Sequence, residues 1–128
     1  MTRYTLCQLD DIPDNGSKGF ALGKHNNNEI TLDTNPIEAS IFVVRQQNTI
    51  YLYRNHCPHL GLPLEWMPHQ FLDRDGHYIQ CATHGALFRI SDGYCVAGPC
   101  PGDSLTPLPF QIEGKSIIID STLLEPIT

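Results

Sequence analysis

Glycine and proline recur so often along this chain that they leave little room for long helices. The sequence has 10 glycines and 10 prolines among 128 residues, and both residue types destabilise the interior of a helix. The longest stretch without either runs from Ile37 to Cys57. It contains the apolar run Ile41–Val44 and the alternating run Ile50–Tyr53, and both are strand patterns. We therefore expect a folded, β-rich domain.

Two predicted hairpins flank the middle of the chain. The first joins residues 37–45 to residues 49–55, and the second joins Leu108–Glu113 to Ser116–Asp120 across Gly114-Lys115. Residues 10–18 are rich in turn formers. Shorter strands are expected earlier in the chain, at Thr5–Leu9, Gly19–Leu22 and Glu29–Leu32. Together these patterns predict an all-β fold, a small antiparallel β-sandwich or barrel.

The segment between the hairpins, at about residues 56–101, differs in composition from its surroundings. It holds four of the five cysteines, five of the six histidines and half of the prolines. This composition is more typical of a functional site than of an apolar core. We expect a single domain over residues 1–128, with residues 56–101 inserted into it as a subdomain.

Charge and hydropathy exclude several kinds of partner. Eight Lys and Arg against 14 Asp and Glu give a formal charge of −6, which is the wrong sign for binding nucleic acid or an anionic membrane surface. No apolar run approaches the roughly 20 residues that span a bilayer, and the segment Met1–Leu6 lacks the apolar core of a signal peptide. We expect a cytoplasmic protein, in which an odd number of cysteines serves metals or lies buried.

Two short segments each combine one cysteine with one histidine. We call Cys57-Pro58-His59-Leu60-Gly61 the first arm and Cys81-Ala82-Thr83-His84-Gly85 the second arm; 21 residues separate His59 from Cys81. Thiolate and imidazole ligands suit zinc or an iron–sulfur centre, and the glycine in each arm permits a tight turn. Structural zinc sites usually pair like ligands, whereas a two-iron cluster explains arms of mixed ligands.

These arms and two further motifs resemble the Rieske-type [2Fe-2S] proteins. The resemblance includes Gly19-Phe20, the first arm with the preceding Asn55-His56, the second arm extended to Phe88, and Gly98-Pro99. It implies a Rieske-like fold over most of the chain, with the inserted segment as a cluster-binding subdomain. The 21-residue gap is a few residues longer than the commonest family spacing.

The resemblance also implies a ligand set. Cys57 and Cys81 would bind one iron, His59 and His84 the other, and Gly98–Pro101 would be a third loop beside the cluster. Because thiolates favour ferric iron more than neutral imidazoles do, the added electron is expected on the iron bound by the histidines. The outer histidine nitrogens would then face solvent and a redox partner.

The same resemblance places the chain in the low-potential branch, similar to the ferredoxin components of ring-hydroxylating oxygenase systems. Leu62 and Thr83 occupy the positions where high-potential members form a disulfide. Ala86 and Phe88 occupy the positions of a Ser and a Tyr that donate hydrogen bonds to cluster sulfur. Both pairs of residues predict a low midpoint potential.

We therefore expect a soluble one-electron carrier with a Rieske-type [2Fe-2S] cluster. It would pass electrons between a reductase and a terminal oxygenase or other oxidoreductase, with no independent catalytic site. An alternative is a small iron–sulfur subunit of a larger oxidoreductase, similar to the nitrite reductase small subunit. A redox-sensing or zinc-stabilised interaction module is the third interpretation.

Other cysteines and histidines are given plainer roles. Cys7 lies alone on an apolar strand and is expected in the core. Cys95 and Cys100 could form a disulfide or an extra metal site, but we favour packed thiols near the third loop. His25, His69 and His77 lie among polar, turn-forming residues and are expected at the surface.

Overall fold

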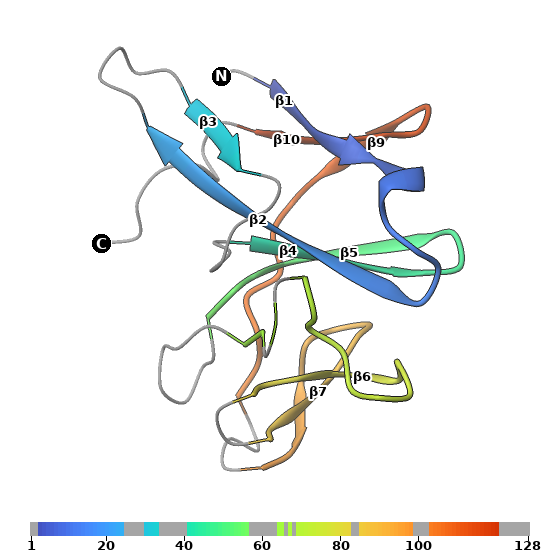
Figure 1. The fold of residues 1–128 in the computed structure, drawn as a ribbon, viewed down its shortest axis with the longest axis vertical. Coiled ribbons are helices and arrows are strands. Elements are labelled where there is room, and N and C mark those ends of the chain that lie inside the picture. Colours follow the sequence, from blue (N-terminus) through green and yellow to red (C-terminus); the bar gives the residue numbers. More distant parts are fainter. Residues whose placement is uncertain are drawn as a thin grey trace.

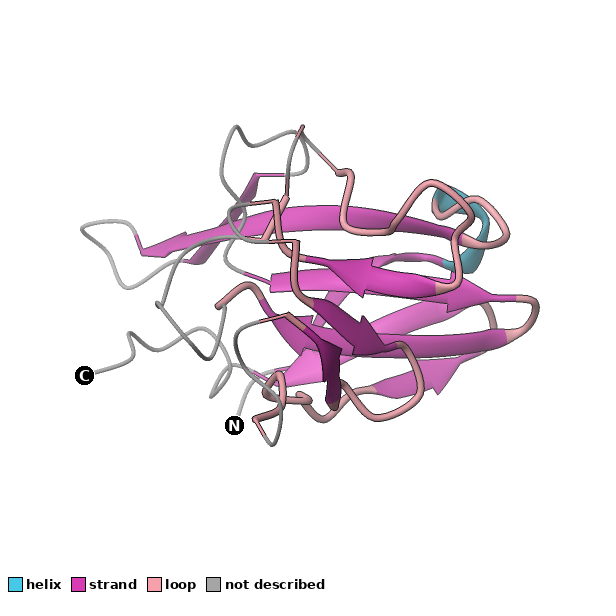
Figure 2. Cartoon of the chain, turned by 90° about the horizontal axis from the view of Figure 1, so that it is seen from below, coloured by secondary structure: helices cyan, strands magenta, loops and turns pink. Residues whose placement is uncertain are grey.

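The computed structural model describes residues 3–24, 30–33, 41–56, 64–65, 67, 69–82, 85–98 and 103–120. Their strands form three antiparallel sheets, ordered β1-β10-β9, β3-β2-β4-β5 and β6-β7-β8 (Figure 1). In these residues the only helical element is the short 3-10 turn η1 (Leu9–Asp11), at one end of the molecule (Figure 2). The all-β prediction is confirmed. The strands are β1 (Arg3–Gln8), β2 (Gly16–Lys24), β3 (Ile30–Asp33), β4 (Ile41–Gln46), β5 (Thr49–Arg54), β6 (Tyr78–Gln80), β7 (Leu87–Arg89), β8 (Cys95–Ala97), β9 (Gln111–Glu113) and β10 (Ser116–Asp120).

Strand β4 separates two hydrophobic cores. Successive side chains of a strand point to opposite faces, so Ile41 and Val43 pack in one core while Phe42 and Val44 pack in the other. This explains why the apolar run is continuous and buried throughout. The basal core lies among the first two sheets and contains Leu6, Cys7, Ile12, Phe20, Ile41, Val43, Ile50, Leu52, Leu108, Ile117 and Ile119.

The second core, which we call the site-side core, joins β4 and β5 to the third sheet. Phe42 stacks on Phe71 with 4.3 Å between ring centroids and 6° between ring planes. The Tyr53 hydroxyl donates a hydrogen bond of 2.6 Å to the Ile90 carbonyl. The core contains Phe42, Val44, Tyr53, Leu64, Phe71, Leu72, Ile79, Cys81, Ala86, Phe88, Ile90, Cys95 and Leu105. The third sheet is therefore fixed on the outer face of the β4–β5 hairpin.

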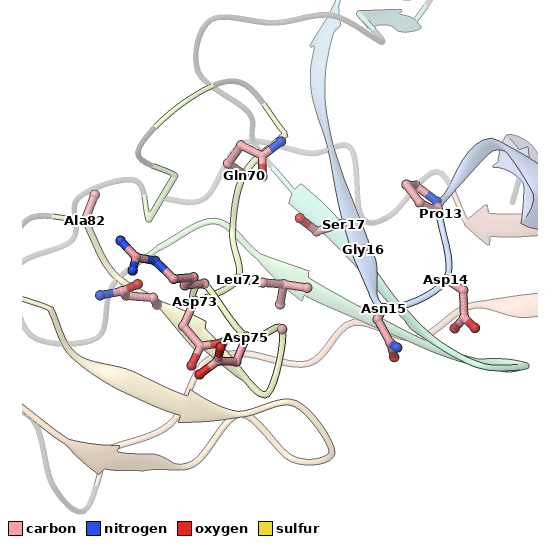
Figure 3. Close-up of a pocket in the computed structure, with 13 residues that line it drawn as sticks. Pro13, Asp14, Asn15, Gly16, Ser17, Gln70, Leu72, Asp73, Asp75 and Ala82 are labelled. Carbon is pink, nitrogen blue, oxygen red and sulfur yellow. The ribbon is translucent and has the colours of Figure 1, made fainter.

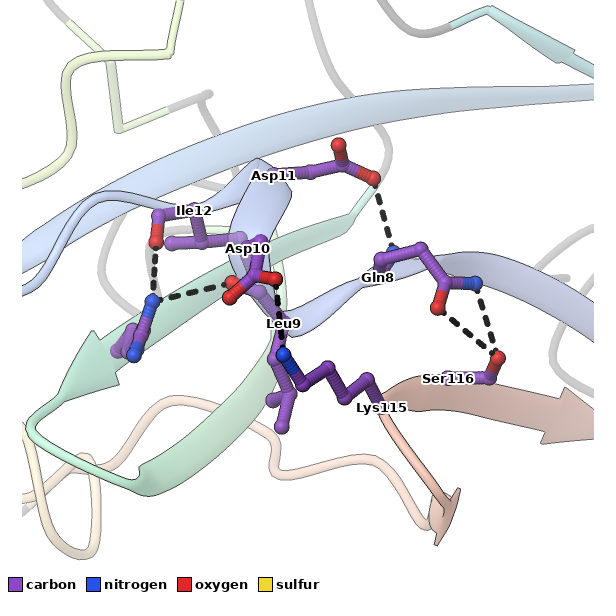
Figure 4. Close-up of polar contacts among 8 residues, drawn as sticks. Gln8, Leu9, Asp10, Asp11, Ile12, Lys115 and Ser116 are labelled. Carbon is purple, nitrogen blue, oxygen red and sulfur yellow. Dashed lines mark hydrogen bonds and ion pairs between the residues drawn. The ribbon is translucent and has the colours of Figure 1, made fainter.

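Polar contacts fix the corner where the first two sheets meet (Figure 4). The Arg45 guanidinium donates to the carbonyls of Leu9 and Ile12, at 3.2 and 2.9 Å. The Gln8 side chain donates to Ser116 Oγ at 2.9 Å, which ties β1 to the start of β10. Both contacts keep the N-terminal strand in the β framework.

The observed strands differ from the sequence prediction in two places. The β4–β5 and β9–β10 hairpins are confirmed, but β2 begins at Gly16, within the segment predicted as turns. There, residues 16–20 pair with β4, and this pairing overrides the local turn preference. The three short strands of the third sheet were not predicted, because three residues are too few to show a periodic pattern. No helix among the described residues is long and apolar enough to cross a bilayer.

Candidate metal centre

One of the four predicted ligands, Cys81, lies in the described part of the chain, whereas Cys57, His59 and His84 lie outside it. Cys81 directly follows β6 and is 1% exposed. Its N–H donates to the Ala86 carbonyl at 2.9 Å, and its carbonyl accepts from the Gly85 N–H at 2.8 Å. Since β6 pairs with β7, the second arm is the loop of a β-hairpin, with Cys81 at its first position.

Glycine permits the geometry of this hairpin loop. Gly85 has a φ of +67°, a left-handed conformation that residues with side chains rarely adopt. The prediction that this glycine allows a tight turn is confirmed.

The two sequence segments that flank the first arm lie next to each other and next to the second arm. Asn55 directly follows β5, and its Oδ1 accepts a hydrogen bond from the Leu64 N–H at 2.8 Å. The Leu64 carbonyl accepts from the Ala82 N–H at 2.9 Å. Residues on both sides of the first arm are thus joined to each other and to the residue after Cys81. The fold therefore brings the residues that flank the first arm next to the start of the second arm, although 21 residues separate His59 from Cys81.

The third predicted loop begins in contact with the second arm's hairpin. Gly98 follows β8 and has a φ of +99°. A Cβ atom at this position would lie 2.7 Å from the Ala86 Cα, closer than real Cβ atoms approach. Only glycine fits there. Pro99, Cys100 and Pro101 lie outside the described residues.

The residues present fit a [2Fe-2S] cluster. The chain supplies two thiolates and two imidazoles in its arms, and the described thiolate donor, Cys81, is buried. Burial suits a cluster ligand because it excludes water from the metal–sulfur bonds. The described residues themselves contain no group of three or more His, Cys, Asp or Glu that could hold a metal ion.

The other two cysteines that the structure describes, Cys7 and Cys95, fit the interpretation as buried, packed thiols. Cys7 is buried, as predicted, and burial together with the charge of Asp11 raises its pKa to about 12. Cys95 is buried in the site-side core, and its thiol donates to the Ala97 carbonyl at 3.3 Å. Cys100 lies outside the described residues, so the expectation that it is a packed thiol near the third loop stays a prediction.

Of the three histidines assigned to the surface, His25 lies outside the described residues, and the other two behave differently. His77 is exposed. The expectation for His69 is wrong: this residue is half-buried, and its Nδ1 accepts from the Gly19 N–H of β2 at 3.0 Å. Its carbonyl also accepts from the Ser17 hydroxyl at 2.7 Å. His69 therefore anchors the longer segment between the arms to the β framework, a role that depends on tertiary contacts.

A cleft lies beside the second arm and is not lined by the predicted donors. It has a volume of about 810 Å³ between residues 13–17 and residues 70–76, and Ala82 lines its end nearest the arm (Figure 3). Its lining includes Asp14, Asp73 and Asp75 but no cysteine or histidine. Its donors do not match those of a Rieske centre.

Asn55 is the functional candidate that the sequence prediction missed. It is the one polar or charged side chain buried in the described part of the chain. Its position two residues before Cys57, at the end of a strand, was a usable signal. Its partners at Leu64 and Glu65 could not be predicted, since they depend on the path of the first arm.

Comparison with known proteins gives a consistent result. The family model for the Rieske [2Fe-2S] domain matches residues 2–113. The 3-phenylpropionate/cinnamic acid dioxygenase ferredoxin subunit of Shigella boydii serotype 4 is 29% identical, over 98% of this chain and 100% of that protein.

Solved structures share the fold at lower identity. The ferredoxin of carbazole 1,9a-dioxygenase from Nocardioides aromaticivorans IC177 has a TM-score of 0.64 at 19% identity, covering 93% of this chain and 97% of that one. A complex of reduced oxygenase and oxidized ferredoxin in carbazole 1,9a-dioxygenase gives a TM-score of 0.61 at 16% identity, with 91% of each chain covered. Because the family match spans residues 2–113, this protein belongs to the Rieske [2Fe-2S] domain family, and its cofactor is a [2Fe-2S] cluster.

Proposed function

We propose that this protein is the ferredoxin component of an oxygenase system, which carries single electrons from a reductase to a terminal oxygenase. The observation that carries the proposal is the end-to-end match to a ferredoxin subunit, over 98% of this chain and 100% of the relative. The solved complex between an oxygenase and a ferredoxin of this fold supports the same kind of partner.

In this proposal Cys57 and Cys81 bind one iron, and His59 and His84 bind the other. The bound cluster supplies reversible one-electron transfer. The two thiolates would place their negative charge on one iron. The iron bound by the two neutral imidazoles would be the one that faces a redox partner. The buried position of Cys81 and the backbone link from Leu64 to Ala82 support an arrangement in which both arms contribute to one site.

We further propose that residues 1–128 form one domain with a cluster-binding subdomain at about residues 56–101. The separate basal and site-side cores support this division. Strands β4 and β5 supply residues to both cores, so the subdomain would depend on the β framework for part of its packing.

We also propose a cytoplasmic location. The odd number of cysteines and the buried Cys7 thiol fit a reducing compartment. Cell fractionation followed by immunodetection tests this location, and recovery of the mature chain outside the cytoplasm would contradict it.

The ligand assignment is tested by replacing Cys57, His59, Cys81 and His84 with Ala, one at a time. Each variant is expected to lose the two irons and two sulfides of the native protein, together with its Rieske EPR signal. Cys95→Ala is the matched control, because it removes a buried cysteine that we do not assign to the cluster, and it should keep both irons. Full iron content in any of the four ligand variants would refute the assignment.

The carrier function is tested by stopped-flow electron transfer with a reductase and an oxygenase of the same source. Rapid reduction by the former and rapid oxidation by the latter are expected. Stable co-purification with one large subunit, without exchange between partners, would instead indicate the subunit of a larger oxidoreductase. A colourless protein that contains zinc would refute the carrier function altogether.

A further inference from the structure

A single buried side chain, that of Asn55, joins the residues that flank the first arm on both sides. Asn55 is 8% exposed, and its Oδ1 accepts from the Leu64 N–H at 2.8 Å. Its Nδ2 donates to Glu65 Oε1 at 2.7 Å. The oxygen and the nitrogen of this amide thus bind consecutive residues on the far side of the arm. The ends of the segment that contains Cys57 and His59 are held at a fixed separation.

Leu64 extends this connection to the second arm. It is fully buried, and its peptide groups bond in both directions: the N–H donates to Asn55 and the carbonyl accepts from the Ala82 N–H at 2.9 Å. Ala82 immediately follows Cys81. Two hydrogen bonds through Leu64 therefore connect Asn55, two residues before Cys57, to Ala82, the residue after Cys81.

This path is costly to break. Without Asn55, the Leu64 N–H would be a buried donor with no acceptor in place of water, and an unsatisfied buried donor destabilises the fold that contains it. The bond from Asn55 to Glu65 involves a carboxylate, and such charge-assisted bonds are stronger than neutral ones. Leu62 and Thr83 cannot form a disulfide between the arms, so this noncovalent path has no covalent counterpart at those positions.

We propose that Asn55, acting with Glu65, is a positioning residue for the electron-transfer centre, which sets the spacing of the two ligand arms. The proposal rests on the ligand assignment above. The proposal goes further than that assignment because it gives Asn55, which is not a ligand, a role in setting the geometry of the ligands.

The test compares three variants. Asn55→Leu removes both hydrogen bonds at similar volume and without a change of charge. Glu65→Gln removes the charge but leaves an oxygen that can accept from Asn55. The double variant Asn55→Asp, Glu65→Gln restores the contact with its polarity reversed and keeps the formal charge of the native protein.

The readouts are the EPR g-values of the reduced protein, the midpoint potential and the rate of amide hydrogen exchange at residues 64–65 and 82. Asn55→Leu is expected to change the g-values and the potential, and to speed exchange about tenfold. Glu65→Gln and the double variant should keep the native g-values and native exchange. If Asn55→Leu does not fold, Asn55→Asp at pH 8 replaces it. This variant places two carboxylates opposite each other and breaks only the bond to Glu65. The g-values, the potential and the exchange rate are then expected to lie between those of the native protein and those predicted for Asn55→Leu.

Tyr53→Phe is the control for a purely structural effect. It removes another buried hydrogen bond, the 2.6 Å bond to Ile90, outside both arms. It should lower thermal stability without changing the g-values. Native g-values, potential and exchange in Asn55→Leu would overturn the proposal, and so would equal changes in Tyr53→Phe. A native protein without a [2Fe-2S] cluster would refute the proposed function, whereas amide exchange would still report on the Asn55 contacts.

Discussion

At the scale of single residues, the close approach of Gly98 to Ala86 makes a sharp prediction. Gly98→Ala forces a left-handed backbone on alanine and places its Cβ 2.7 Å from the Ala86 Cα. The second arm's hairpin and the third loop must then separate, so we expect loss of most of the bound iron. Iron analysis and the visible absorption spectrum measure the outcome.

Gly114→Ala is the matched control for that variant. Gly114 also has a positive φ, of +64°, but an added Cβ there meets nothing within 4 Å. Both variants should lose about 1–2 kcal/mol of stability through the backbone alone. Equal iron content in the two variants would show that the contact between Gly98 and Ala86 does not support the cluster.

Two other residues beside Cys81 are expected to set the midpoint potential. Ala86 and Phe88 are both fully buried and apolar, so neither can donate a hydrogen bond to cluster sulfur. We expect a potential near the lower end of the Rieske range, about −150 mV. Ala86→Ser with Phe88→Tyr adds two donors that stabilise the reduced state, and protein-film voltammetry should show a higher potential. An unchanged or lower value would count against this explanation, and the single variants separate the two contributions.

At the scale of secondary-structure elements, the strands that were predicted are those with long apolar patterns. Ile41–Val44 and the two hairpins could be recognised because the pattern extends over four or more residues. The third sheet could not be, since β6, β7 and β8 are three residues each and are stabilised by the site-side core. Likewise, the arms were predicted from their ligand spacing. The hydrogen bonds through Asn55 and Leu64 were not, because they join segments whose proximity depends on the whole fold.

Strand β1 carries a pH-dependent contribution to stability. Burial and Asp11 raise the pKa of Cys7 from 9.0 to about 12 in the folded protein. The unfolded thiol therefore ionises first, so this contribution is complete below pH 9 and is lost as the pH rises from about 9 to 12. The loss approaches about 1.4 kcal/mol per pH unit within this window.

Cys7→Ala removes that dependence. Urea unfolding of the native protein and of the variant at pH 7, pH 8 and pH 10.5 gives the difference in stability at each pH. We expect the advantage of the native protein over the variant to shrink at pH 10.5, and to be constant between pH 7 and pH 8. A difference that stays the same at all three pH values would show that the folded thiol ionises like the unfolded one.

At the scale of the whole molecule, the charge of −6 governs encounters with redox partners. An acidic carrier is attracted to a basic patch on its partner, and such steering raises association above the unsteered rate of about 10⁵–10⁶ M⁻¹s⁻¹. At physiological ionic strength the attraction extends only about 8 Å. The charges nearest the docking surface should therefore dominate. In Figure 1 the third sheet lies in the lowest part of the molecule and η1 lies at the right of the upper half, so charges beside each can be tested separately.

Asp103 and Asp10 provide the matched pair for this test. Both are exposed; the Asp103 carbonyl accepts from the Cys95 N–H of β8, whereas Asp10 lies on η1 and pairs with Lys115. If partners dock at the arms, Asp103→Asn should slow electron transfer from the reductase several-fold at low salt and flatten its dependence on ionic strength. Asp10→Asn removes the same charge and should leave both quantities close to native. Equal effects of the two variants in stopped-flow measurements would mean that net charge alone steers the encounter, and a larger effect of Asp10→Asn would place the docking surface at the opposite end of the fold.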